Sequence, residues 1–260
     1  MVDHSRYAIQ LSAAQSMGKR KDQQDSCYAS RPEIQRDIGV ICVVADGMGG
    51  LSNGKQASQR VVETMVNTFY CSTINETPEQ ILLSGCMQAQ KDVRALQQTP
   101  GESGSTLVAA IVRDDRCSFL SVGDSRIYLF RGGGLIQLTR DQNRGMRTDL
   151  QIALGRLPEE ARTDRKRAAL TSYIGMEGEL KTDRSSNAFP VIPGDRIVLM
   201  TDGVYGALSE EDMAEAMALP ENQVANAIID KVAERDRAAQ DNCMVVVIDV
   251  SLRDPPGGEV

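Results

Sequence analysis

Short runs of aliphatic and β-branched residues constrain the fold of this chain more than any other feature. They occur at residues 38–45, 106–112, 117–122, 127–130, 197–201 and 244–250. Each run is too short for a typical helix and lacks the polar alternation of a strand with one wet face, so it is typical of a strand covered on both faces. The chain is therefore expected to bury a sheet between other layers.

Between these runs, apolar residues recur at helical spacing over residues 57–69, 82–96 and 224–232. Ser209, followed three residues later by Asp212, predicts a capped helix over the segment EEDMAEAMA. The helices cluster after the first strand and before the last, while several strands follow one another as hairpins. This order predicts a layered α+β fold rather than strict βαβ alternation.

The first strand leads into a glycine-rich loop, VVADGMGGLSNGKQAS. Gly49, Gly54 and Lys55 have the spacing of a phosphate-binding P-loop, but Gln56 stands where that loop needs a Ser or Thr hydroxyl. Asp46, just before the glycines, would also repel phosphates. An ordinary Asp-Gly hairpin turn is the stronger alternative, although no partner strand follows directly.

Aspartates stand at the margins of four apolar strands: Asp46, Asp124, Asp202 and Asp241. For any one of them, a turn is the simpler interpretation. Strand ends in one region of a sheet can converge, however, and a group of carboxylates without softer ligands suits hard cations such as Mg²⁺ or Mn²⁺. For the set as a whole, a metal site is the better explanation.

Composition narrows the classes of function. The 36 acidic and 29 basic residues give a net charge of −7, which argues against a nucleic-acid binder. The only histidine is His4, so histidine-based catalytic pairs have almost no histidine to use. The N-terminus lacks the apolar core of a signal peptide, and no apolar run is long enough to span a bilayer. We expect a cytoplasmic protein without membrane insertion.

Eight segments resemble, in order and over nearly the whole chain, those of the PP2C-like (PPM) metal-dependent protein serine/threonine phosphatases of bacterial type. They are GKRKDQQDS, VVADGMGG, SGSTLVAAIV, SVGDSRIYLFR, LTRDQN, ALTSYIG, LMTDGVYGALS and QDNCMVVVIDV. The resemblance implies a four-layer αββα sandwich, with two central antiparallel sheets flanked by helices. It also implies a centre of two Mn²⁺ or Mg²⁺ ions, with room for a third.

The resemblance implies a role for each acidic position. Asp46 is similar to the carboxylate that bridges the two metals, and the carbonyl of Gly47 to a ligand of one of them. Asp202 and Asp241 match the carboxylates that complete the other metal's shell. Asp124 resembles the residue that binds a third metal jointly with Asp202; the alternative interpretation is the turn of a hairpin joining two strands.

Arg20 matches the arginine that grips the substrate phosphate, a role that suits its planar donors. The alternative is a solvated charge in the basic run KRK. Asp25 matches an aspartate that supports the site through hydrogen bonds or metal-bound water. The residues implied in catalysis are Arg20, Asp25, Asp46, Asp202 and Asp241.

The implied reaction is hydrolysis of phosphoserine and phosphothreonine by a metal-activated water. In agreement, no Cys is followed six positions later by Arg, and no D-x-D pair offers an aspartyl nucleophile. Two positions depart from common family patterns. Met48 stands where many eukaryotic members have a histidine proton donor, and Gln24 stands where some members have Glu.

The resemblance divides the chain into a phosphatase domain over residues 1–252, with a variable flap around 142–187, and a disordered tail over 253–260. Between residues 144 and 167 the flap carries seven basic residues, which form either a solvated charged face or a docking surface for substrate. They are Arg144, Arg147, Arg156, Arg162, Arg165, Lys166 and Arg167. The expected partners are phosphorylated proteins, including a bacterial Ser/Thr kinase or its targets. The alternative function is a non-catalytic regulatory binding module.

Overall fold

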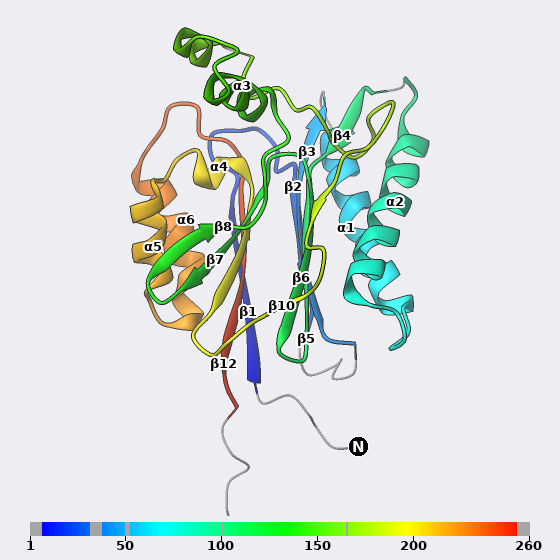
Figure 1. The fold of residues 1–260 in the computed structure, drawn as a ribbon, viewed down its shortest axis with the longest axis vertical. Coiled ribbons are helices and arrows are strands. Elements are labelled where there is room, and N and C mark those ends of the chain that lie inside the picture. Colours follow the sequence, from blue (N-terminus) through cyan, green and yellow to red (C-terminus); the bar gives the residue numbers. More distant parts are fainter. Residues whose placement is uncertain (1–6, 32–37, 50–52, 100, 165, 254–260) are drawn as a thin grey trace, which may run out of the picture.

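Two β-sheets face each other and are covered by helices on both outer sides (Figure 1). The computed structural model describes residues 7–31, 38–49, 53–99, 101–164 and 166–253. His4, Gly50 of the glycine-rich loop, Arg165 and all of the expected tail except Arg253 lie outside these ranges. The prediction of two antiparallel sheets flanked by helices is confirmed.

The first sheet has the strand order β1-β12-β11-β7-β8, and every neighbouring pair is antiparallel. Its strands are β1 (Tyr7–Ser16), β12 (Cys243–Leu252), β11 (Arg196–Met200), β7 (Arg126–Arg131) and β8 (Gly134–Gln137). β1 is an edge strand, and it pairs with β12 along its whole length.

The second sheet has the order β10-β6-β5-β3-β2, with β4 paired to β3 and β9 paired to β6. Its strands are β10 (Phe189–Pro190), β6 (Arg116–Val122), β5 (Leu107–Arg113), β3 (Val40–Gly49), β2 (Asp25–Ala29), β4 (Ser103–Ser105) and β9 (Asp183–Arg184). β2 is an edge strand here, so each sheet has one N-terminal strand at its edge.

Alternate residues of the central strands fill two different cores. In β3, Cys42 and Val44 pack between the sheets, while Ile41 and Val43 pack under helices. In β12, Val246 likewise faces the other sheet. Burial on both faces explains why these strands are continuous apolar runs, and all six predicted strands are present.

Helices α1 (Asn53–Cys71) and α2 (Pro78–Leu96) cover the second sheet. Helices α5 (Glu210–Met217) and α6 (Val224–Glu234) cover the first. The predicted cap of α5 is confirmed, because the Ser209 hydroxyl accepts from the backbone N–H of Asp212 at 3.1 Å and the Asp212 side chain accepts in return. No helix within the described ranges has the length and apolar character needed to cross a bilayer.

The first half of the segment at 142–187 projects from one end of the sandwich, where it forms helix α3 (Arg144–Ala153) and a short 3₁₀ helix at Glu159–Thr163 (Figure 1). Its second half returns to the second sheet, where β9 pairs with β6. We call residues 142–187 the flap. α3 buries only Gly145 and Ile152, so its larger apolar side chains at Met146 and Leu150 stay exposed.

Candidate active site

Two aspartates meet where β2 and β3 pair. Asp25, the first residue of β2, lies directly opposite Asp46 in the antiparallel register. Asp25 is 6% exposed and Asp46 is half-buried. Like charges directly opposite each other on a sheet are destabilising, so this pair needs a reason beyond the stability of the strands.

Asp202 and Asp241 approach the same point from the first sheet. Asp202 follows β11 and opens the short helix α4 (Asp202–Tyr205), and Asp241 lies in the loop before β12. The negative charges of both residues act on Asp25 and on Asp46. The fold therefore brings together carboxylates that are up to 216 positions apart in the sequence, the separation from Asp25 to Asp241.

Burial and mutual repulsion raise the pKa values of these carboxyl groups. Burial raises the pKa of Asp25 to about 7, although the Thr201 hydroxyl donates to its Oδ2 at 2.9 Å and opposes the shift. Burial, followed by the charge of Asp25, also raises the pKa of Asp46 well above its ordinary value. The pKa of Asp202 is raised by burial and then by Asp241. The site thus concentrates acidic groups whose mutual repulsion opposes their ionisation.

The oxygen atoms of these carboxylates are the type of ligand that a hard cation prefers. Asp202 Oδ1 is buried and has no hydrogen-bond partner among the residues that the structure describes, so a strong acceptor within the group is left unused. Over the described residues, no three Asp, Glu, His or Cys side chains already stand close enough together to enclose an ion. The donors are nevertheless all oxygens, as Mg²⁺ and Mn²⁺ prefer, and a cation would reverse the repulsion that raises the pKa values.

Asp124 lies in the connection between β6 and β7 and is 8% exposed. These strands belong to different sheets, so the alternative of a hairpin turn at Asp124 is wrong. Burial, followed by the charge of Asp202, raises the pKa of Asp124 to about 7. The Asn143 amide donates to its carboxylate at 3.4 Å, and the Tyr205 hydroxyl donates to its backbone carbonyl at 2.9 Å. Asp124 thus borders the same acidic group.

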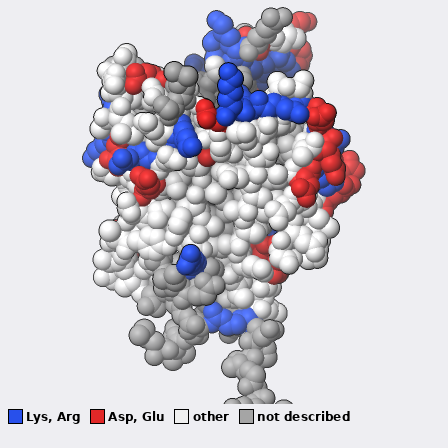
Figure 2. Space-filling view, turned by 180° about the vertical axis from the view of Figure 1, so that it is seen from behind, with Lys and Arg blue, Asp and Glu red and all other residues white. Residues whose placement is uncertain are grey.

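Arg20 faces the acidic group across an open pocket of about 600 Å³. Its Nη2 donates to Asp241 Oδ2 at 2.5 Å, and both side chains remain partly exposed. Asp46 and Met48 line the same pocket. Lys and Arg side chains gather at the upper end of the face seen in Figure 2, which is the end that carries α3 in Figure 1. An anionic substrate would meet this basic rim before it reached the carboxylates.

Gly47 sits in β3 beside Asp46, so the alternative of an Asp-Gly hairpin turn is wrong. A Cβ at Gly47 would lie 2.1 Å from the carbonyl oxygen of Gly54 and 2.6 Å from that of Gln24. Only glycine allows these backbones to come so close. The role of the Gly47 carbonyl as a metal ligand stays a prediction.

Sequence reasoning missed the residues that hold the aspartates and Arg20 in place. Asn242 accepts from the backbone N–H of Gln24 at 2.9 Å and donates to the carbonyls of Met17 and Asp22, each at 3.0 Å. In the same way, the Thr201 hydroxyl donates to the Asp25 carboxylate and the Asn143 amide donates to the Asp124 carboxylate. All three lie within segments already quoted for the family resemblance, no more than two residues from an aspartate, so this proximity in the sequence was the available signal.

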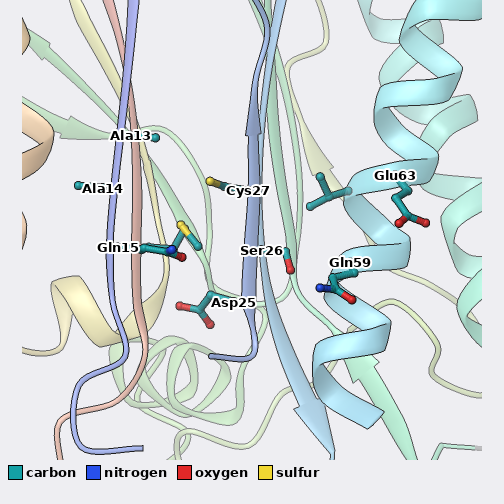
Figure 3. A pocket seen from close by; sticks show the side chains of 10 residues that line it. Ala13, Ala14, Gln15, Asp25, Ser26, Cys27, Gln59 and Glu63 are labelled. Carbon is teal, nitrogen blue, oxygen red and sulfur yellow. The ribbon is translucent and has the colours of Figure 1, made fainter. Parts of the chain in front are cut away.

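A second pocket, of about 560 Å³, opens between the edge strands β1 and β2. Figure 3 shows Gln15 from β1 and Asp25 and Cys27 from β2 in the space between these strands, while Ser26 points toward α1. Asp25 is therefore reached from this side, whereas its strand partner Asp46 lines the pocket of Arg20. Asp25 therefore lines a different pocket from Arg20.

Comparison with known proteins adds independent evidence. The model of the protein phosphatase 2C family matches residues 17–240. The serine/threonine protein phosphatase PstP of Mycobacterium tuberculosis is 31% identical over 243 residues, which are 89% of this chain and 43% of that protein. The chain thus spans less than half the length of this relative.

Solved structures give the same result. The PPM Ser-Thr phosphatase MsPP from Mycobacterium smegmatis, crystallised with cacodylate, is 28% identical, and the match has a TM-score of 0.74 and covers 92% of this chain and 97% of that one. The catalytic domain of PstP with two manganese ions is 26% identical, with a TM-score of 0.73 and coverage of 94% and 99%.

Proposed function

The chain belongs to the protein phosphatase 2C family, and from this membership we propose that it hydrolyses phosphoserine and phosphothreonine in proteins with the help of divalent cations. The observation that carries the proposal is the largely buried acidic group around Asp46, in which Asp202 Oδ1 has no hydrogen-bond partner among the described residues. A non-catalytic binding module would not need to retain carboxylates at such an electrostatic cost.

In this proposal Asp46, Asp202, Asp241 and the Gly47 carbonyl hold two Mn²⁺ or Mg²⁺ ions, and Asp124 with Asp202 holds a third. Such ions lower the pKa of a bound water and neutralise charge on phosphoryl oxygens. Asp25, opposite Asp46, fixes the position of that carboxylate across the strand pair.

Arg20 binds the phosphoryl group of the substrate. Its ion pair with Asp241 uses one of five guanidinium donors, so others remain to meet phosphoryl oxygens in the open pocket. The same ion pair holds the guanidinium at the rim. Met48, which lines the pocket, carries no titratable proton, so the leaving group receives its proton from another donor.

The proposed partners are cytoplasmic proteins phosphorylated by a bacterial Ser/Thr kinase, and that kinase itself. The proposed catalytic unit is residues 1–252, with the flap at 142–187 beside the site. Curated bacterial serine/threonine phosphatases among the relatives support a phosphatase function over that of a P-loop nucleotide hydrolase.

Hydrolysis of a phosphothreonine peptide by chelated protein, with Mn²⁺ or Mg²⁺ added back, tests the proposal. Turnover is expected only with metal, and Asp46→Asn and Asp202→Asn are each expected to lower kcat by at least about 100-fold, because each removes charge from the metal ligands. Asp230→Asn, on the exposed side of α6, is the matched control and is expected to be fully active. Folded wild-type protein that is inactive with both metals would overturn the proposal in favour of a binding module.

A further inference from the structure

A separate cavity of about 490 Å³ lies on the flap, between α3 and the segments around residues 157 and 170. Arg144, Arg147, Thr148 and Gln151 line it from one face of α3, since positions three, four and seven apart lie on the same side of a helix. Thr171 contributes to the opposite wall. The lining thus combines two cations and several hydroxyl and amide groups with two leucines, Leu157 and Leu170.

The backbone holds the two walls together. The N–H of Arg144 donates to the carbonyl of Ala169 at 2.9 Å, and the N–H of Thr171 donates to the carbonyl of Gln142 at 2.7 Å. A β-bridge joins Asn143 and Leu170 between these bonds. The start of α3 and the facing segment therefore form one unit around the cavity.

The two arginines of the cavity are not neutralised. Arg162 and Arg167 on the same flap both pair with Asp149, Arg167 at 2.6 Å. Among the residues that the structure describes, neither Arg144 nor Arg147 finds a side-chain hydrogen bond or an ion pair. Two unpaired guanidinium groups that line one cavity leave it complementary to an anion.

The cavity begins next to the acidic site. Asn143, which caps α3, donates to Asp124, and the charge of Asp202 acts on Asp124. Arg144 follows Asn143 directly. Because an extended chain advances about 3.3 Å per residue, we expect residues that flank a phosphothreonine bound at the acidic site to reach the flap.

We propose that the cavity lined by Arg144 and Arg147 binds an anionic side chain of the phosphoprotein substrate, a carboxylate or a second phosphoryl group, a few residues from the phosphothreonine that is hydrolysed. The inference rests on the proposed function and deepens it, because it names the sequence context that this site selects. Carboxylates and phosphoryl groups share the geometry that guanidinium groups bind.

The test compares phosphothreonine peptides that differ only in their flanks. One peptide has neutral flanks; the others carry Glu or phosphoserine three to five residues before or after the phosphothreonine. In the double variant R144Q/R147Q, kcat/KM for the preferred acidic peptide is expected to fall about five- to tenfold, while that for the neutral peptide is unchanged. The Glu and phosphoserine peptides show which anion binds better.

Arg156→Gln provides the matched control, because Arg156 is an exposed flap arginine that does not line the cavity. This variant is expected to leave kcat/KM unchanged for both the acidic and the neutral peptide. A further variant, R144E/R147E, is expected to prefer peptides with Lys in place of Glu. Equal loss on neutral and acidic peptides, or no loss on either, would overturn the inference while leaving the proposed function intact.

If the protein shows no turnover, a binding measurement still tests the cavity proposal separately from the proposed phosphatase function. Fluorescence anisotropy of labelled acidic and neutral phosphopeptides is measured on wild type and on R144Q/R147Q. Weaker binding of only the acidic peptide by the variant supports the cavity, whatever the activity of the acidic site. Identical affinities in the two proteins would contradict it.

Discussion

Asn242 is the residue that ties the loop bearing Arg20 to the acidic group. Its side chain makes three hydrogen bonds to the backbone of residues 17–24, and it is 5% exposed. A neutral amide is suited to this position because it donates and accepts at once. The placement of Arg20 opposite Asp46 therefore depends on a residue that is not charged.

Asn242→Ala is expected to lower kcat/KM for a phosphothreonine peptide about tenfold, because misplacing a positioning group costs activity even when the catalytic residues remain. Steady-state kinetics measure the effect, and thermal unfolding checks that the variant is folded. Asn222→Ala, at an exposed position before α6, is the control. Unchanged kinetics in folded Asn242→Ala would show that the loop needs no such clamp.

At the residue scale, the sequence predicted the acidic set but not its supports. Aspartates at strand margins form a visible pattern, and the family resemblance assigned each of them an expected role. The hydrogen bonds of Thr201, Asn143 and Asn242 depend on distances between segments far apart in the chain, which spacing along the sequence does not reveal.

At the scale of elements, α4 packs very closely on the loop before β12. A Cβ at Gly203 would lie 1.9 Å from the carbonyl oxygen of Asn242. Gln240 strengthens the contact by donating to the Gly203 carbonyl at 2.9 Å. Because Asp202 and Asp241 flank this contact, the close approach of the two backbones sets the spacing between their carboxylates.

Gly203→Ala is expected to lower the free energy of unfolding by about 1–3 kcal/mol, the usual cost of an extra methyl group in a packed site. Urea unfolding measures it. Gly134→Ala, in exposed β8, would place its Cβ 3.5 Å from the nearest atom and is expected to change stability by less than about 0.5 kcal/mol. Equal stability of the two variants would contradict the account of this contact.

The elements that sequence reasoning found are those with strong apolar patterns. β1 was missed because its residues are mostly half-buried at a sheet edge, so YAIQLSAAQS mixes polar and apolar positions without a clear period. α3 was missed for a related reason, because most of its surface meets solvent rather than a core. Weak burial leaves a weak signal in the sequence.

At the scale of the whole molecule, a buried ion pair joins the first sheet to its helical layer. Arg196 on β11 donates to Asp249 on β12 at 2.7 Å and also to the carbonyl of Met217 at the end of α5. Asp249 is 1% exposed, and its Oδ2 accepts no hydrogen bond from any residue in the described ranges. Burial outweighs the attraction of Arg196 and raises the pKa of Asp249 to about 6.

This shift predicts a pH dependence of stability. Because the pKa of Asp249 is higher in the folded than in the unfolded chain, the folded state binds more protons between about pH 4 and pH 6. The contribution of the Asp249 carboxyl group to the free energy of unfolding is fully present below pH 4 and is lost as the pH rises through 6. Relative to Asp249→Asn, wild type is expected to lose about 2–3 kcal/mol of unfolding free energy from pH 4 to pH 7.

Urea unfolding of wild type and Asp249→Asn at several pH values, both in chelator, measures that difference. The other carboxyl groups are common to both proteins, so their titration cancels. A difference in unfolding free energy that stays constant with pH, or grows in favour of wild type as the pH rises, would contradict the prediction.

The central claim, that the acidic group around Asp46 holds divalent cations, is tested most directly by calorimetric titration of chelated protein with MnCl₂. Wild type and Asp230→Asn are expected to bind at least two Mn²⁺ ions per chain, the number in the related PstP structure. Asp46→Asn is expected to lose at least one of them. Saturable binding that is the same in Asp46→Asn as in wild type, or no saturable binding at all, would contradict the claim.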